Sequence, residues 1–122
     1  MTETRIAGYR DLRVWQRAFE LALVSYQAAR QFPRSELFEL SSQIRRAAVS
    51  VMANIAEGNG RLSRAEYLHF LRIAHGSLRE LEAELLLAEA LGFLDRGTLN
   101  RVLVLSTEVG RMLGKMMKRL AA

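Results

Sequence analysis

Apolar residues recur along the chain at alternating steps of three and four, which is the spacing of one face of an α-helix. The first such row is made of Leu12, Trp15, Phe19, Ala22, Tyr26 and Ala29. The second row is Leu37, Leu40, Ile44, Ala48, Val51 and Ile55. The third is Tyr67, Leu71, Ala74, Leu78, Leu81, Leu85 and Ala88, and the fourth is Leu99, Val102, Ser106, Val109, Leu113, Met116 and Leu120. The pattern predicts four amphipathic helices, each of which buries one face.

Three short segments interrupt this periodicity, at residues 31–35, 58–60 and 92–98. The first contains the only proline of the chain, and the other two contain glycines. Proline and glycine end helices for different reasons, since proline restricts the residue before it and glycine accepts the backbone conformation that closes a helix. Each interruption is therefore read as a tight connection between two helices.

Residues that cap helix N-termini follow each interruption. Ser35 is expected to cap the second helix, Ser63 with Glu66 forms a capping box for the third, and Thr98 is expected to cap the fourth. The predicted helices cover about 11–31, 36–57, 64–91 and 98–120. Short connections place successive helices side by side in opposite directions, so we expect an all-α, antiparallel up-down-up-down four-helix bundle forming a single domain over residues 1–122.

The second helix has another row beside its apolar one, made of small or polar residues at the same spacing. Its members are Gln43, Ala47, Ser50, Asn54 and Glu57. Two interpretations are open: a solvated helix face, or a half-buried polar seam covered by more protein. We favour the seam, because no charged residue occurs between Arg46 and Glu57, and a solvated face rarely runs so far without charge.

Glu57 lies at the end of its helix, where a carboxylate faces the negative end of the helix dipole. An uncompensated charge at this position costs roughly 0.3–1 kcal/mol. We therefore expect Glu57 to be bound by an arginine, with Arg46, Arg61 and Arg64 as the candidates, or by backbone amide donors at the start of a neighbouring helix.

The composition restricts the location of the protein. The chain has 122 residues and no cysteine, which excludes a disulfide framework and thiolate metal sites. Its apolar runs are far shorter than the ~20 residues that span a bilayer, and residues 1–10 have no apolar signal core. We expect a cytoplasmic protein that does not cross a membrane.

The net charge of +5 at pH 7 is concentrated in the first and fourth helices. A continuous cationic surface binds phosphate backbones without reading their sequence. The candidate nucleic-acid-binding residues are Arg13, Arg17, Arg101, Arg111, Lys115, Lys118 and Arg119. The alternative is a basic surface that only keeps the protein soluble; no motif of a sequence-reading protein is present.

The sequence offers no catalytic or metal site. Glu66 and His69 have the spacing of half a di-iron site, but the second Glu-x-x-His that such a site needs is missing. Gly58, Gly60 and Arg61 do not form a phosphate-binding loop, because no strand precedes them and no lysine follows. We expect a protein that is not an enzyme and that has no cofactor.

Three segments resemble the proteins encoded in 23S rRNA intervening sequences: YRDLRVWQRAFEL, QFPRSELFELSSQIRRAAVSVMANIAEGNGR and EYLHFLRIAHGSLRELEAEL. The runs at 43–47 and 54–58 are the most specific, and the resemblance is looser in the fourth helix, at EVGRML. It implies an antiparallel four-helix bundle that assembles into a homopentamer. Met52 stands where that family often has proline, so we expect a straighter second helix.

The resemblance also implies partners. A related protein is an accessory factor of the reverse transcriptase of diversity-generating retroelements, in which a basic ring surface contacts nucleic acid and the enzyme. Two functions are therefore expected: an oligomeric scaffold that associates with RNA or DNA during RNA processing or reverse transcription, or a structural, protein-binding homo-oligomer without a nucleic-acid role. In either case the seam is expected at a subunit or helix interface, through Gln43, Arg46, Ser50, Asn54 and Glu57.

Overall fold

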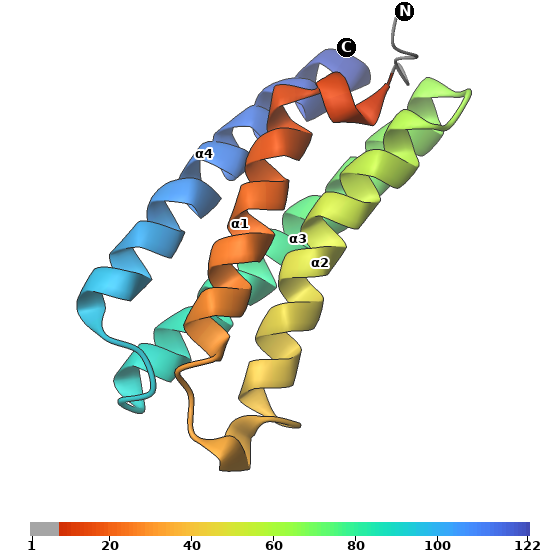
Figure 1. The fold of residues 1–122 in the computed structure, drawn as a ribbon. Coiled ribbons are helices and arrows are strands. Elements are labelled where there is room, and N and C mark those ends of the chain that lie inside the picture. Colours follow the sequence, from red (N-terminus) through yellow and green to blue (C-terminus); the bar gives the residue numbers. More distant parts are fainter. Residues whose placement is uncertain (1–7) are drawn as a thin grey trace, which may run out of the picture.

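A computed structural model describes residues 8–122, and these residues form four α-helices in an antiparallel bundle (Figure 1). The helices are α1 (Arg13–Ala29), α2 (Leu40–Asn59), α3 (Arg64–Ala90) and α4 (Arg96–Ala121). Two 3-10 turns, η1 (Tyr9–Asp11) and η2 (Arg34–Glu36), precede α1 and α2. Successive helices pack against one another, and α1 also packs against α4, which closes the bundle. The predicted all-α four-helix fold is confirmed.

The second helix begins later and ends later than predicted. Residues 34–36 form η2 after Pro33, so Ser35 does not cap α2; the Glu36 carboxylate instead accepts a hydrogen bond from the backbone N–H of Leu40 (3.3 Å). The helix continues through Gly58 to Asn59, because Gly58 is buried against α3 and keeps helical geometry there.

Side-chain caps determine where α3 and α4 begin. The Ser63 hydroxyl accepts a hydrogen bond from the N–H of Glu66 (3.0 Å), as predicted. Asp95, rather than Thr98, caps α4: its carboxylate accepts hydrogen bonds from both the N–H (2.7 Å) and the hydroxyl (3.0 Å) of Thr98. Thr98 is thus a partner of the cap, and α4 starts at Arg96.

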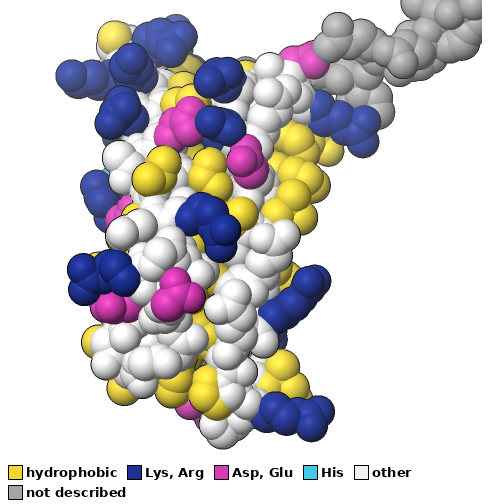
Figure 2. Space-filling view, turned by 60° about the vertical axis from the view of Figure 1, so that its left-hand side comes forward, with side chains coloured by type: hydrophobic (Ala, Val, Ile, Leu, Met, Phe, Trp, Pro, Cys, Tyr) yellow, Lys and Arg dark blue, Asp and Glu magenta, His cyan; other side chains and the backbone are white. Residues whose placement is uncertain are grey.

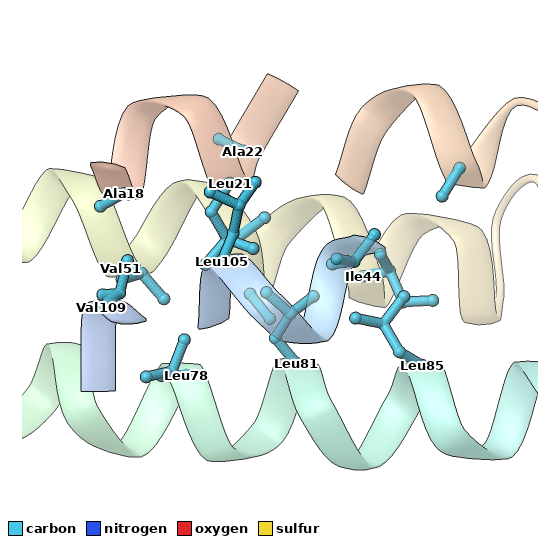
Figure 3. Packing of buried hydrophobic residues seen from close by; sticks show 14 of the residues in the cluster. Ala18, Leu21, Ala22, Ile44, Val51, Leu78, Leu81, Leu85, Leu105 and Val109 are labelled. Atoms are coloured by element: carbon cyan, nitrogen blue, oxygen red, sulfur yellow. The ribbon is translucent and has the colours of Figure 1, made fainter. Parts of the chain in front are cut away.

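The core consists of leucine, isoleucine, valine and alanine side chains contributed by all four helices (Figure 3). In this view Leu78 of α3 points toward Val51 of α2 and Val109 of α4, and Leu85 points toward Ile44 of α2. The rows predicted for the last three helices supply most of this core, although Leu37 lies exposed in front of α2.

The buried face of α1 differs from the predicted one. Its core-facing row is Val14, Ala18, Leu21, Ala22, Ser25, Ala28 and Ala29. Phe19 and Tyr26, predicted to be core residues, are 42% and 38% exposed. Each follows a buried residue by one position, which rotates it about 100° around the helix. The small buried residues let α1 approach the bundle closely and leave the aromatic row outside.

Candidate nucleic-acid interface

The outer face of α4 presents a row of cationic side chains. Arg111, Lys115 and Lys118 are exposed and follow one another at steps of four and three residues, which keeps them on one side of the helix. Arg101 and Arg119 are also exposed on this helix. None of these five residues forms an ion pair within the described part of the chain. We call them the α4 cation row.

Figure 2 shows the side of the molecule that carries α4. Lys and Arg side chains are spread over this side and gather at the end of the bundle that holds the C-terminus. Cations in the last turn of a helix also interact favourably with its dipole, so Lys118 and Arg119 are well placed on α4. The arrangement provides a basic surface that does not disturb the helix carrying it.

The two arginines predicted on the first helix have a different environment. Arg17 binds Glu108 of α4 through two nitrogens, each 3.0 Å from a carboxylate oxygen, and Glu20 at 2.7 Å. Hydrogen bonding and charge from Glu108 raise the pKa of Arg17. Arg13 lies 3.8 Å from the same carboxylate. These pairs join α1 to α4. Glu108 lies on α4 and lines a hollow with Arg111, but its ion pairs are with Arg13 and Arg17 of α1.

The polar seam predicted on α2 lies against α3 of the same chain over its middle part. The hydroxyl oxygens of Ser50 and Ser77 are 2.7 Å apart. The amide of Asn54 donates to the carbonyl oxygen (2.9 Å) and hydroxyl (3.0 Å) of Ser50, one turn earlier. Ala47, which belongs to the same row, is buried. The seam is here a helix–helix interface within the bundle.

The end of the seam brings the two backbones close together. A Cβ atom added at Gly58 would lie 2.8 Å from Cβ of Phe70 and 3.1 Å from Cδ1 of Tyr67. The neighbouring Asn59 amide donates to the Tyr67 hydroxyl (3.3 Å). Glycine is therefore required at position 58 by the approach of α3, although it lies inside a helix.

Glu57 is not half-buried as predicted, because it lies on the outer edge of the seam; its side chain is 55% exposed. Of the three candidate partners, Arg61 is the one that binds it, at 2.8 Å. The Arg61 guanidinium also lies 4.8 Å from the centre of the Phe70 ring. Gln43 and Arg46 are exposed as well. The Arg61 guanidinium, one turn further along the chain, thus offsets the unfavourable interaction of the Glu57 carboxylate with the negative end of the helix dipole.

Glu84 on α3 is a titratable group with an unusual environment. Burial and the charge and hydrogen bond of Glu80, one turn earlier, raise its pKa to about 7, against the opposing effect of Arg46 on α2. One of its carboxyl oxygens is buried without a hydrogen-bond partner in the described structure. The only signal in the sequence is a pair of glutamates four residues apart beside the buried Leu81 and Leu85.

A strip of apolar side chains is exposed along α1 and α2. It consists of Phe19, Leu23, Tyr26, Val49 and the half-buried Met52, which line a shallow hollow of about 270 Å³ whose rim includes Gln27 and Arg30. Leu23 is the most exposed of the first four. The apolar periodicity predicts Phe19 and Tyr26 to be core residues, so it gives no signal for this surface. We call it the α1–α2 apolar strip.

The described residues contain no cluster of three or more His, Cys, Asp or Glu side chains able to hold a metal ion. Nor does any helix within residues 8–122 have the length and hydropathy needed to cross a membrane.

Comparison with known proteins identifies relatives. The profile of the family described as 23S rRNA-intervening sequence protein matches residues 10–115. The crystal structure of a protein of unknown function from the S23 ribosomal protein family of Bacteroides thetaiotaomicron is similar, with a TM-score of 0.80 and 27% sequence identity. The match covers 86% of this chain and 95% of that one. No curated protein matches the chain.

Proposed function

The chain belongs to the 23S rRNA-intervening sequence protein family, and we propose that it is a non-enzymatic, oligomeric scaffold that associates with RNA or DNA. Contact with nucleic acid is made by the α4 cation row, which binds the phosphate backbone. Contact between copies is made by the α1–α2 apolar strip. The scaffold would serve as an accessory to RNA processing or reverse transcription.

The absence of acidic partners along the α4 cation row, within the described residues, is the observation that supports binding to a polyanion. Several arginines elsewhere on the surface are paired, such as Arg17 with Glu108, Arg61 with Glu57 and Arg79 with Glu82. Arg111, Lys115 and Lys118 instead repel one another within two turns of helix. A phosphate backbone relieves this repulsion and releases its own counterions when it binds.

Self-assembly is supported by the α1–α2 apolar strip. Monomeric proteins rarely expose contiguous apolar surface with several large side chains, and such surface marks sites of protein contact. If five copies assemble, as the family resemblance implies, the net charge of +5 per chain becomes about +25. Assembly would then multiply the basic surface presented to one nucleic-acid molecule.

Charge reversal on α4 tests the nucleic-acid role. We expect the triple variant Arg111→Glu, Lys115→Glu, Lys118→Glu to bind RNA about 10- to 100-fold more weakly at low salt, as measured by fluorescence anisotropy. The matched control is Arg10→Glu, Arg34→Glu, Arg72→Glu, which changes the net charge equally at exposed positions outside both α4 and the α1–α2 apolar strip. Equal losses in the two variants would mean that binding follows net charge only.

The alternative function is a structural or protein-binding homo-oligomer without a nucleic-acid role. The α1–α2 apolar strip fits this function equally well, since a structural homo-oligomer needs no cationic surface. In that case, the protein would fold and assemble but would show no salt-dependent affinity for RNA or single-stranded DNA.

A further inference from the structure

We infer that the α4 cation row recognises double-helical nucleic acid in preference to single strands; this inference rests on the proposed function. Proteins that bind single strands without sequence preference combine cations with aromatic side chains on which bases stack. Duplex binding by the backbone needs cations alone, because the bases are already stacked on one another. The question is therefore whether an aromatic face is available beside the cations.

The cationic helix itself contains no phenylalanine, tyrosine or tryptophan between Arg96 and Ala121. The aromatic side chains that α3 places near the C-terminal end of α4 are Tyr67 and Phe70, and both are half-buried. The Phe70 ring carries the Arg61 guanidinium at 4.8 Å, and the Tyr67 ring packs against Gly58. The Tyr67 ring also lines a hollow with Arg119 at the end of the row, whereas the hollows beside Arg111 and Lys115 are lined by no aromatic side chain.

Exposed aromatic side chains occur elsewhere. Phe19 and Tyr26 belong to the α1–α2 apolar strip, and Phe38, which is 86% exposed, lies in the connection before α2. Trp15 is stacked on Phe19, with ring centres 5.2 Å apart, and contacts Tyr9 with its edge. The molecule thus keeps its accessible aromatic surface off the helix that carries the unpaired cations.

The cation row also has a geometry suited to a stiff ligand. It lies on one uninterrupted helix, so Arg101 and Lys118 are about 26 Å apart along the axis at 1.5 Å per residue. A duplex presents about one charge per 1.7 Å of its axis, twice the density of one of its strands, and releases more counterions per contact. With charge alone acting, the duplex is the tighter ligand.

The direct test compares one RNA strand that lacks self-complementarity with the duplex formed by adding its complement, using fluorescence anisotropy at the same salt. We expect the dissociation constant of the duplex to be roughly tenfold lower. Equal or tighter binding of the single strand would overturn the inference and leave the proposed function intact. Binding of neither would overturn both.

A gained stacking site provides a second test. Val104 is 68% exposed and lies three residues after Arg101 and seven before Arg111, within the cation row. Val104→Trp should tighten single-strand binding about tenfold and reduce the duplex preference, whereas the control Val104→Leu should leave both affinities unchanged. If a folded Val104→Trp protein kept the original ratio, the lack of stacking could not be what sets the preference.

Discussion

The hydroxyl oxygens of Ser50 on α2 and Ser77 on α3 lie 2.7 Å apart, at the middle of the contact between these helices. Two side chains this short can meet only if the helix backbones are close. Ala47 and Gly58 extend the same small-residue surface toward the two ends of α2. The small residues of the polar seam therefore allow α2 to pack closely on α3. Substitutions that enlarge a side chain at this contact test the close packing.

Gly58→Ala adds a methyl group where Phe70 leaves no room. Overpacking costs about 1–3 kcal/mol, and the better helix propensity of alanine returns up to about 1 kcal/mol, so we expect a net loss of about 1 kcal/mol in the free energy of unfolding. The control is Gly76→Ala on α3, where the added atom meets nothing within 4 Å. That variant should gain about 0.5–1 kcal/mol. Urea titrations measure both, and stabilisation of the Gly58 variant would contradict the close approach.

Glu84→Gln should flatten the pH dependence of stability. The pKa of Glu84 is raised to about 7 in the folded protein, so the folded state binds more protons than the unfolded state between the two pKa values. The stabilising contribution of Glu84 to the free energy of unfolding is fully present below its pKa in the unfolded chain and is lost as the pH rises through about 7. The melting temperature of the variant, relative to the native protein, should therefore increase from acidic to alkaline pH.

The control for this measurement is Glu66→Gln, which makes the same chemical change at an exposed position of α3. The melting temperature of this control should change with pH in the same way as that of the native protein. If the melting temperature of the Glu84 variant followed the same pH dependence as the native protein, a raised pKa of Glu84 would be ruled out.

Leu23→Glu should prevent self-assembly. The substitution places a charge in the middle of the α1–α2 apolar strip, where burial against another copy would leave it unpaired. In the isolated chain Leu23 is more than half exposed, so the fold should survive. Light scattering should report a lower mass than for the native protein, with unchanged helical circular dichroism. A native mass would locate the interface elsewhere.

Glu57→Ala should have little effect on either stability or assembly. The Glu57–Arg61 pair is exposed, and such pairs contribute about 0–1 kcal/mol. We expect a loss of no more than about 0.5 kcal/mol and the native mass by light scattering. A dissociated protein would show that the outer edge of the seam, rather than the strip, joins the copies.

The sequence predicted much of the fold because caps and apolar rows are local signals. Ser63 and the row from Leu71 to Ala88 act as expected. The prediction of the buried face of α1 was wrong because two rows of residues, one through Ala18 and one through Phe19, have the same helical period. The row through Phe19 has the larger apolar side chains and therefore the stronger hydrophobic signal. Only the packing of α1 on the other helices distinguishes them.

The candidate site was less predictable, because it depends on contacts between distant residues. Arg17 and Glu108 are 91 residues apart, and nothing in either segment indicates that they pair. Periodicity did place Arg111, Lys115 and Lys118 on one face, since that relation is local to one helix. The sequence therefore identified the cations but not which of them are neutralised.

The salt dependence of RNA binding tests the central claim, that the α4 cation row contacts a phosphate backbone. The logarithm of the association constant, plotted against the logarithm of salt concentration, should fall with a slope of magnitude at least about 3 for the native protein. The Arg111, Lys115, Lys118 charge-reversal variant should have a slope smaller by about 3. A slope near zero for the native protein, or the same slope for both proteins, would contradict the claim.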